Sequence, residues 1–164
     1  MFELVLGGFK SGKSRFALSL FGQEQGAIIV SGKGLDFEFK KRILRHRQER
    51  GQNWTTVETD ADLGATLQDT SQYFSSLLVE GLDFWFFSLD KSKDKHIDNF
   101  WQSLKQIKGH VVLVSSELSL GLVPPGIDSQ LIREFAGFNQ KLANLCQRVY
   151  LVVAGCALTV KQEK

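Results

Sequence analysis

Short apolar runs that end at a glycine or a polar turn recur along the whole chain. Most of these runs are rich in valine, isoleucine and leucine, and such residues favour strands in the buried parts of a sheet. The pattern predicts a series of strands, the last of them less regular than the others. They cover residues 2–6, 27–30, 55–58, 76–80, 110–115, 148–154 and 157–160.

Most intervals between these strands carry apolar residues at helical spacing. Helices are predicted over residues 11–22, 37–50, 98–107 and 130–146. Because continuous apolar strands alternate with helices, the predicted fold class is α/β, with three layers and a mostly parallel central sheet. The polar interval 88–99 is expected to be a surface excursion. The chain has no internal repeat and no low-complexity linker, and we expect a single domain over residues 1–164.

A phosphate-binding loop follows the first predicted strand. Residues 7–14 read GGFKSGKS, which matches the pattern GxxxxGK[ST] between a strand and a helix. Glycines let successive N–H groups wrap around a polyphosphate, and the helix N-terminus adds its positive end. The alternative is a glycine-rich turn without a ligand. The predicted nucleotide contacts in the loop are Gly7, Gly8, Phe9, Lys10, Ser11, Gly12, Lys13 and Ser14.

Two of these side chains have specific expected roles. Lys13 can reach the β- and γ-phosphates, and the Ser14 hydroxyl can bind Mg²⁺. Proteins with such a loop usually place an acid at the end of a neighbouring strand to support the metal. Glu80 ends the predicted strand 76–80 and is the first candidate, with Asp83 close behind and Glu117 as a second candidate.

A basic segment, residues 40–54, reads KKRILRHRQERGQNW. If residues 37–50 form a helix, Arg42, His46 and Arg50 fall at successive i,i+4 positions on one stripe. Flanking guanidinium groups favour the neutral imidazole, which can act as a nucleophile, and they can hold phosphate oxygens. A solvated charged face and a nucleic-acid contact are the alternatives from these residues alone.

The composition of the chain bears on nucleic-acid binding, on membrane insertion and on the location of the protein. The net charge is only +2, whereas nucleic-acid-binding domains usually show a strongly basic balance. No apolar run is long enough for a membrane span, and the start MFELVLGG lacks the features of a signal peptide. Cys146 and Cys156 lie in or beside apolar runs and are predicted to be buried free thiols. A reducing, cytoplasmic location is therefore expected.

Several segments together resemble one family, the bifunctional adenosylcobinamide kinase/adenosylcobinamide-phosphate guanylyltransferases of cobalamin biosynthesis. The most specific part is R-I-x-x-H-x-x-x-R followed by W-x-T-x-E, which is residues 42–50 and 54–58 here. The loop GGFKSGKSRFAL, the segment LLVEGLDFW and the later GLVP and GFNQ reinforce the resemblance. It covers nearly the whole chain.

The resemblance implies two reactions and a RecA-like P-loop fold. With ATP or GTP as substrate and Mg²⁺ as cofactor, the family phosphorylates adenosylcobinamide, a corrinoid. Its histidine then attacks the α-phosphate of GTP, and GMP passes from this guanylyl-histidine to adenosylcobinamide phosphate. Carried over, His46 is the nucleophile, and no nucleic acid is involved. Family members are homotrimers, so a homo-oligomer is expected. The further implied nucleotide contacts are Ser31, Gly32, Lys33, Arg47, Gln48, Glu49, Arg50, Glu58 and Glu80.

Some positions differ from the pattern of that family. They include Leu18 where an acid is usual, Ser31-Gly32 where Ala-Thr is usual, and Asp83 and Ser116 where Thr and Asn are usual. These positions bear on corrinoid recognition and on the kinase reaction. The alternatives are therefore a kinase or nucleotidyltransferase with one activity, and a non-catalytic paralogue that binds GTP or contacts RNA.

Overall fold

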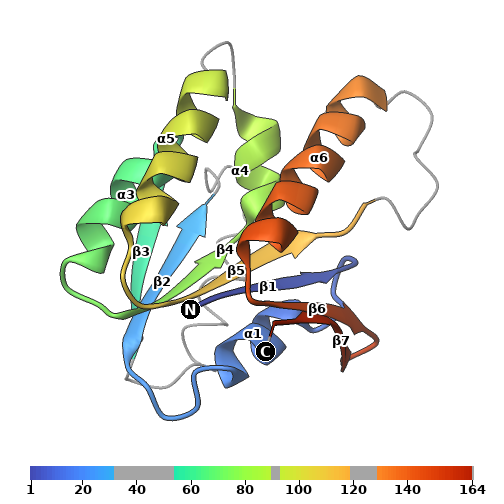
Figure 1. The fold of residues 1–164 in the computed structure, drawn as a ribbon, viewed down its shortest axis with the longest axis horizontal. Coiled ribbons are helices and arrows are strands. Elements are labelled where there is room, and N and C mark those ends of the chain that lie inside the picture. The colour runs from blue at the N-terminus through green and yellow to red at the C-terminus, as the bar shows by residue number, and fades with distance from the viewer. Residues whose placement is uncertain (32–53, 90–92, 119–128, 164) are drawn as a thin grey trace.

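In the computed structural model, which describes residues 1–31, 54–89, 93–118 and 129–163, one sheet runs through the molecule (Figure 1). Its seven strands lie in the order β3-β2-β4-β5-β1-β6-β7. All neighbours are parallel except β7, which runs antiparallel to β6. All the strands predicted from the sequence are confirmed. Their bounds are Phe2–Gly7 (β1), Gly26–Ser31 (β2), Trp54–Thr59 (β3), Ser76–Glu80 (β4), His110–Ser116 (β5), Arg148–Val153 (β6) and Cys156–Gln162 (β7).

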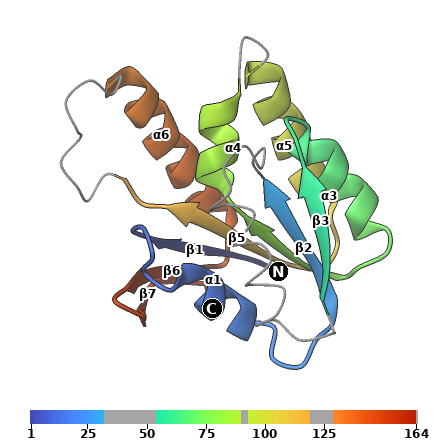
Figure 2. The ribbon, with the colours of Figure 1, turned by 180° about the vertical axis from the view of Figure 1, so that it is seen from behind.

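Helices cover both faces of this sheet, which confirms the α/β class and the three layers. Among the described residues, α1 lies on one face, and α3, α4, α5 and α6 lie on the other (Figures 1 and 2). The bounds are Lys13–Ser19 (α1), Leu63–Ser71 (α3), Leu82–Ser88 (α4), Lys93–Gln106 (α5) and Ser129–Leu145 (α6). The helix predicted over 37–50 lies outside the described residues.

Four helices differ from the predictions. α3 and α4 were not expected, because α3 buries only a few large side chains and α4 is a short run, LDFWFFS, without a clear period. α5 begins at Lys93, inside the interval 88–99 that was expected to be an excursion. Its first turns are polar and partly exposed, so no helical period of apolar residues marks them. α1 ends at Ser19, earlier than the predicted helix 11–22.

The core is split between the two faces because successive residues of a strand point in opposite directions. Leu4 and Ile29 face α3 to α6, whereas their neighbours Val5 and Ile28 face α1. The thicker side is filled by aromatic rings from α4, α5 and α6. Their centroids lie 5.2 Å apart for Trp85 and Phe100, and 5.1 Å apart for Phe86 and Phe135. The central strands are buried on both faces, which is why they are continuous apolar runs in the sequence.

The last strand, β7, forms an exposed edge of the described sheet. Cys146, which precedes β6, is buried as predicted, and burial raises the pKa of its thiol to about 12. Cys156, which opens β7, is exposed, so the prediction of a second buried thiol was wrong. An edge strand is hard to distinguish from a core strand by sequence, because both are rich in β-branched residues. Lys161 fixes β7 to α6 by donating from its Nζ to the carbonyls of Ala143 (3.0 Å) and Cys146 (2.8 Å).

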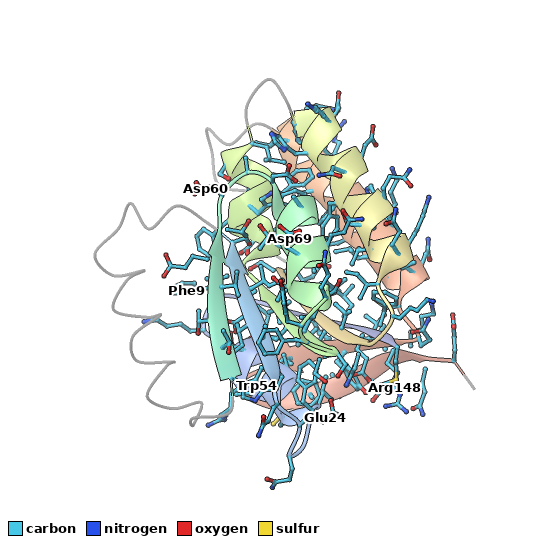
Figure 3. The ribbon with its side chains drawn as sticks, turned by 90° about the vertical axis from the view of Figure 1, so that its left-hand side faces the viewer. Phe9, Glu24, Trp54, Asp60, Asp69 and Arg148 are labelled. Carbon is cyan, nitrogen blue, oxygen red and sulfur yellow. The ribbon has the colours of Figure 1, made fainter. Side chains whose placement is uncertain are left out.

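A buried carboxylate joins three strands at the amino-terminal edge of the sheet. Glu3 is 1% exposed and accepts hydrogen bonds from His110 on β5 (3.0 Å) and Arg148 on β6 (3.2 Å). Figure 3 shows Arg148 and Glu24 at this end of the molecule. Burial raises the pKa of Glu3, but the hydrogen bonds and charges of His110 and Arg148 outweigh it, so the pKa is lowered overall.

Glu3→Gln is expected to lower the free energy of unfolding at pH 7 by about 1–3 kcal/mol, because charged hydrogen bonds in a buried site are replaced by weaker ones. Since folding lowers the pKa of Glu3 below its ordinary value of 4.5, its ionised form stabilises the fold above that pH. This contribution is lost as the pH falls through the folded-state pKa. Urea unfolding between pH 7 and pH 3 measures it, with Glu163→Gln, an exposed partner of Lys161, as the control. A deficit that stays constant over this range would contradict the prediction.

Candidate active site at the phosphate loop

The loop GGFKSGKS connects the carboxyl end of β1 to α1, as predicted. Gly12 caps the helix with φ 97°, a left-handed conformation that favours glycine. Lys10 also has a positive φ, 52°. The positive φ angles of Lys10 and Gly12 reverse the chain between the end of β1 and the first turn of α1. The local sequence therefore builds a concave backbone of the kind that cradles phosphate groups.

Two neighbours hold the loop in place. The N–H of Gly155, in the turn between β6 and β7, donates to the Ser11 carbonyl at 2.8 Å. The N–H of Glu117, just beyond β5, donates to the Gly7 carbonyl at 3.1 Å. A Cβ on Gly7 would lie 2.4 Å from the Val152 carbonyl oxygen, so only glycine fits there. The loop is thus wedged between the ends of β5 and β6.

The groups in the loop fit a polyphosphate ligand. Lys13 folds back over the loop and donates from Nζ to the Gly8 carbonyl at 2.7 Å. The Ser11 hydroxyl is buried and has no hydrogen-bond partner among the described residues. Ser14 lies in the first turn of α1, next to Lys13. In the described part of the chain no three His, Cys, Asp or Glu side chains are grouped to hold a metal.

Two predicted residues meet at the carboxyl ends of β2 and β4, which β5 separates from β1. Glu80 ends β4 and is 8% exposed, and Ser31 ends the adjacent strand β2 and is fully buried. The Ser31 hydroxyl lies 2.9 Å from the Glu80 carbonyl and 2.8 Å from the Gly81 carbonyl. Gly81 has φ 81°, and a Cβ there would lie 2.6 Å from the Ser31 carbonyl. Ser31 therefore ties β2 to the turn that places Glu80.

A second polar link joins α4, β5 and α6. The Ser116 hydroxyl donates to Asp83 Oδ2 at 2.5 Å. Asn139 Nδ2 donates to the Ser116 carbonyl at 2.9 Å, and its Oδ1 accepts from the Ser115 hydroxyl at 2.8 Å. Asp83 and Ser116, two positions that differ from the pattern of the resembling family, are thus bonded to each other. Both residues lie at the carboxyl edge of the sheet, where this hydrogen bond joins them.

Glu58 is not close to the loop. It is exposed on β3, and β2, β4 and β5 lie between β3 and β1. Since neighbouring strands are about 4.8 Å apart, Glu58 lies roughly 19 Å along the sheet from the end of β1. The other predicted residues lie outside the described residues. These are Gly32, Lys33, Arg42, His46, Arg47, Gln48, Glu49 and Arg50.

Comparison with known proteins decides the family. The family described as cobinamide kinase / cobinamide phosphate guanyltransferase, CobU, matches residues 3–160. This chain belongs to that family. The resemblance inferred from the sequence is therefore confirmed.

The CobU family includes full-length relatives of this chain. The bifunctional adenosylcobalamin biosynthesis protein CobP of Pseudomonas aeruginosa is 33% identical over 171 residues, which cover 99% of both chains. The bifunctional adenosylcobalamin biosynthesis protein CobU of Escherichia coli is 31% identical over 181 residues, 98% of this chain and 100% of the relative. The protein of the same name from Salmonella typhimurium is 29% identical over 181 residues, which cover 98% of this chain and 100% of the relative. Of the described helices, none could cross a membrane.

One residue that shapes this CobU-family site was missed from the sequence. Gly155 contacts the loop through its N–H, and its Cα would lie 3.3 Å from a Cβ on Gly12. No local pattern links a hairpin turn to a loop so far away in the chain. The sequence signal for it is a glycine between two short predicted strands, which favours a turn. In the structure Gly155 has φ 81°.

Gly7→Ala is expected to lower the free energy of unfolding by about 1–3 kcal/mol, because the new methyl group overlaps the Val152 carbonyl. For a chain of this size the melting temperature should fall by roughly 3–10 °C. Gly8→Ala is the matched control, since nothing lies within 4 Å of a Cβ at Gly8. Differential scanning calorimetry compares the two variants. Equal melting temperatures would show that the loop is not wedged as described.

Proposed function

We propose that this protein phosphorylates adenosylcobinamide with ATP or GTP and then transfers GMP from GTP to the adenosylcobinamide phosphate formed. The single observation that carries the proposal is the match of residues 3–160 to a family described by both reactions. The geometry of the phosphate loop supports it, because the loop is built and held as a triphosphate site requires. The chain is proposed to act as one nucleotide-binding domain.

The loop is assigned to the kinase reaction. The N–H groups of residues 8–14 would bind the β- and γ-phosphates, and Lys13 would leave the Gly8 carbonyl to stabilise charge on the transferred phosphoryl group. When bound, Mg²⁺ supplies charge neutralisation between the β- and γ-phosphates. Ser14 and Glu80 are the residues of this chain that would hold it. The rest of the catalysis is positioning, since phosphoryl transfer requires little covalent chemistry from the protein.

His46 is assigned to the GMP transfer. Its imidazole nitrogen would form a bond to the α-phosphorus of GTP while the bond to the bridging oxygen breaks and pyrophosphate leaves. A phosphate oxygen of adenosylcobinamide phosphate would then attack the same phosphorus. The P–N bond breaks, His46 is released, and a diphosphate linkage forms. Arg42 and Arg50 are proposed to stabilise the charge on the phosphorus oxygens.

The guanine nucleotide for this second reaction is proposed to lie toward β3. Glu58 is on β3, and the segment 32–53, which contains His46, joins β2 to β3. The distance of roughly 19 Å between Glu58 and the loop along the sheet supports different nucleotide poses for the two reactions. The remaining proposed contacts on this side are Ser31, Gly32, Lys33, Arg47, Gln48, Glu49 and Arg50.

Assembly and location are proposed on the resemblance. We propose a homo-oligomer, a trimer as in the family, with a corrinoid and a nucleoside triphosphate as its substrates. A cytoplasmic location fits both nucleotide substrates. Nucleic acid is not a proposed partner, since the net charge is only +2.

The two activities can be separated with Lys13→Ala and His46→Ala. Purified wild type is incubated with Mg²⁺ and GTP labelled at the α- or the γ-position, then denatured and examined for covalent label. Only α-labelled GTP should label wild type, through an acid-labile bond, and His46→Ala should remain unlabelled. With adenosylcobinamide present, His46→Ala should still transfer the γ-phosphate. Lys13→Ala should lose this transfer by about 100-fold or more.

The outcomes distinguish the alternatives. Label that persists in His46→Ala would remove His46 as the nucleophile. Phosphoryl transfer without any α-label would indicate a kinase alone, and α-label without phosphoryl transfer would indicate a nucleotidyltransferase alone. GTP binding with neither reaction would indicate a non-catalytic paralogue, and the proposed function would then be wrong.

A further inference from the structure

Large apolar side chains are exposed at the carboxyl ends of four neighbouring strands. The strands β4, β5, β1 and β6 are consecutive in the sheet. Phe84 follows β4, Leu118 follows β5, Phe9 follows β1, and Val153 is the last residue of β6. We call these four residues the apolar row. Their exposed fractions are 44% for Phe84, 37% for Leu118, 78% for Phe9 and 52% for Val153.

The apolar row borders the phosphate loop. Phe9 lies within the loop, and Figure 3 shows it at the margin of the molecule, away from α3 and α5. Leu118 follows Glu117, whose N–H donates to the Gly7 carbonyl. Phe84 follows Asp83, which is bonded to Ser116 at the end of β5. With strands about 4.8 Å apart, the row extends roughly 14 Å along the edge.

Exposed apolar groups of this size are otherwise scattered in the described part of the chain. Met1 and Tyr73 precede β1 and β4, at the opposite edge of the sheet. Leu158 and Val160 lie on the edge strand β7. Single exposed apolar residues are ordinary, but a group beside a polar loop usually marks a binding surface. The apolar row is the group that adjoins the proposed site of phosphoryl transfer.

We infer that the apolar row is the docking surface for the ring of the corrinoid substrate. The inference rests on the proposed function, and it assigns the part of the site that holds the acceptor. For transfer, the acceptor hydroxyl must lie in line with the γ-phosphate above the loop. The hydroxyl is carried on a short side arm, so the macrocycle itself must rest on the same edge. The methyl groups of the macrocycle are apolar, and the ring is wide enough to need several contacts, which apolar groups on adjacent strands can supply.

Binding of the nucleotide does not require the apolar row. The loop is proposed to bind phosphates through its main chain and Lys13, whereas Phe84 and Leu118 lie outside the loop. Truncation of Phe84 or Leu118 should therefore weaken binding of the corrinoid and leave binding of GTP unchanged. Losing one large apolar contact that is buried on binding should cost about tenfold in affinity.

The test uses the full-length protein and the variants Phe84→Ala and Leu118→Ala, two members of the apolar row outside the phosphate loop, with Tyr73→Ala as the matched control. Tyr73 is 81% exposed and lies at the far edge of the sheet. The dissociation constant of adenosylcobinamide is measured by titration calorimetry, beside that of a non-hydrolysable GTP analogue. Each variant in the apolar row should raise the corrinoid constant, and the KM for adenosylcobinamide, about tenfold. The KM for GTP should not change, and Tyr73→Ala should behave as wild type.

Each outcome is decisive. Phe84→Ala and Leu118→Ala with wild-type corrinoid affinity would overturn the inference while the proposed function stands. Equal weakening of corrinoid and GTP would also overturn it, because it would indicate a disturbed loop, and a lower melting temperature would identify that cause. If one variant does not fold, Val153→Ala replaces it in the same titration. Failure of wild type to bind or phosphorylate adenosylcobinamide, with GTP still bound, would overturn both the inference and the proposed function.

Discussion

The close approach of Gly7 to Val152 is the contact on which the functional end of the molecule depends. A side chain at position 7 would meet the Val152 carbonyl at 2.4 Å, so β1 can run beside β6 to its last residue only because that residue is glycine. Main-chain hydrogen bonds from Gly155 and Glu117 then close on the loop from either side. These contacts are between backbone groups, so they define the shape of the loop without involving the side chains of Lys13 and Ser14.

Polar side chains extend this arrangement across the carboxyl edge of the sheet. Ser31 joins β2 to the turn after β4, and Asp83, Ser116 and Asn139 join α4 and α6 to β5. Three positions that differ from the family pattern, Ser31, Asp83 and Ser116, all take part in these links. Buried polar groups are costly unless they are satisfied, and each of these three side chains has a hydrogen-bond partner. The differences are therefore accommodated in two separate polar links at the carboxyl edge of the sheet.

The sequence predicted the strands, the class of fold and the loop, because each of these is encoded by neighbouring residues. Central strands such as 27–30 are buried on both faces and are therefore apolar throughout, and GGFKSGKS carries a recognisable local pattern of glycines. The predictions that failed concern features that depend on residues far away in the sequence. The short helix α4 follows no period of its own and packs through Trp85 and Phe86 against α5 and α6. Cys156 is exposed because β7 is an edge, and the contact of Gly155 with the loop joins opposite ends of the chain.

The position of β1 in the middle of the sheet also sets the order in which the protein can be assembled. Phe2 pairs with Val111 and Glu3 pairs with Arg148, so the first strand made has no neighbours until most of the chain has left the ribosome. Pairings between such distant segments close slowly, since a long loop of chain must be ordered first. The loop after β1 gains its last support only when Gly155 has been synthesised. A nascent chain can therefore pair β2 with β3 and β4 before β1 has its neighbours, and the phosphate loop is the last part of this edge to be completed.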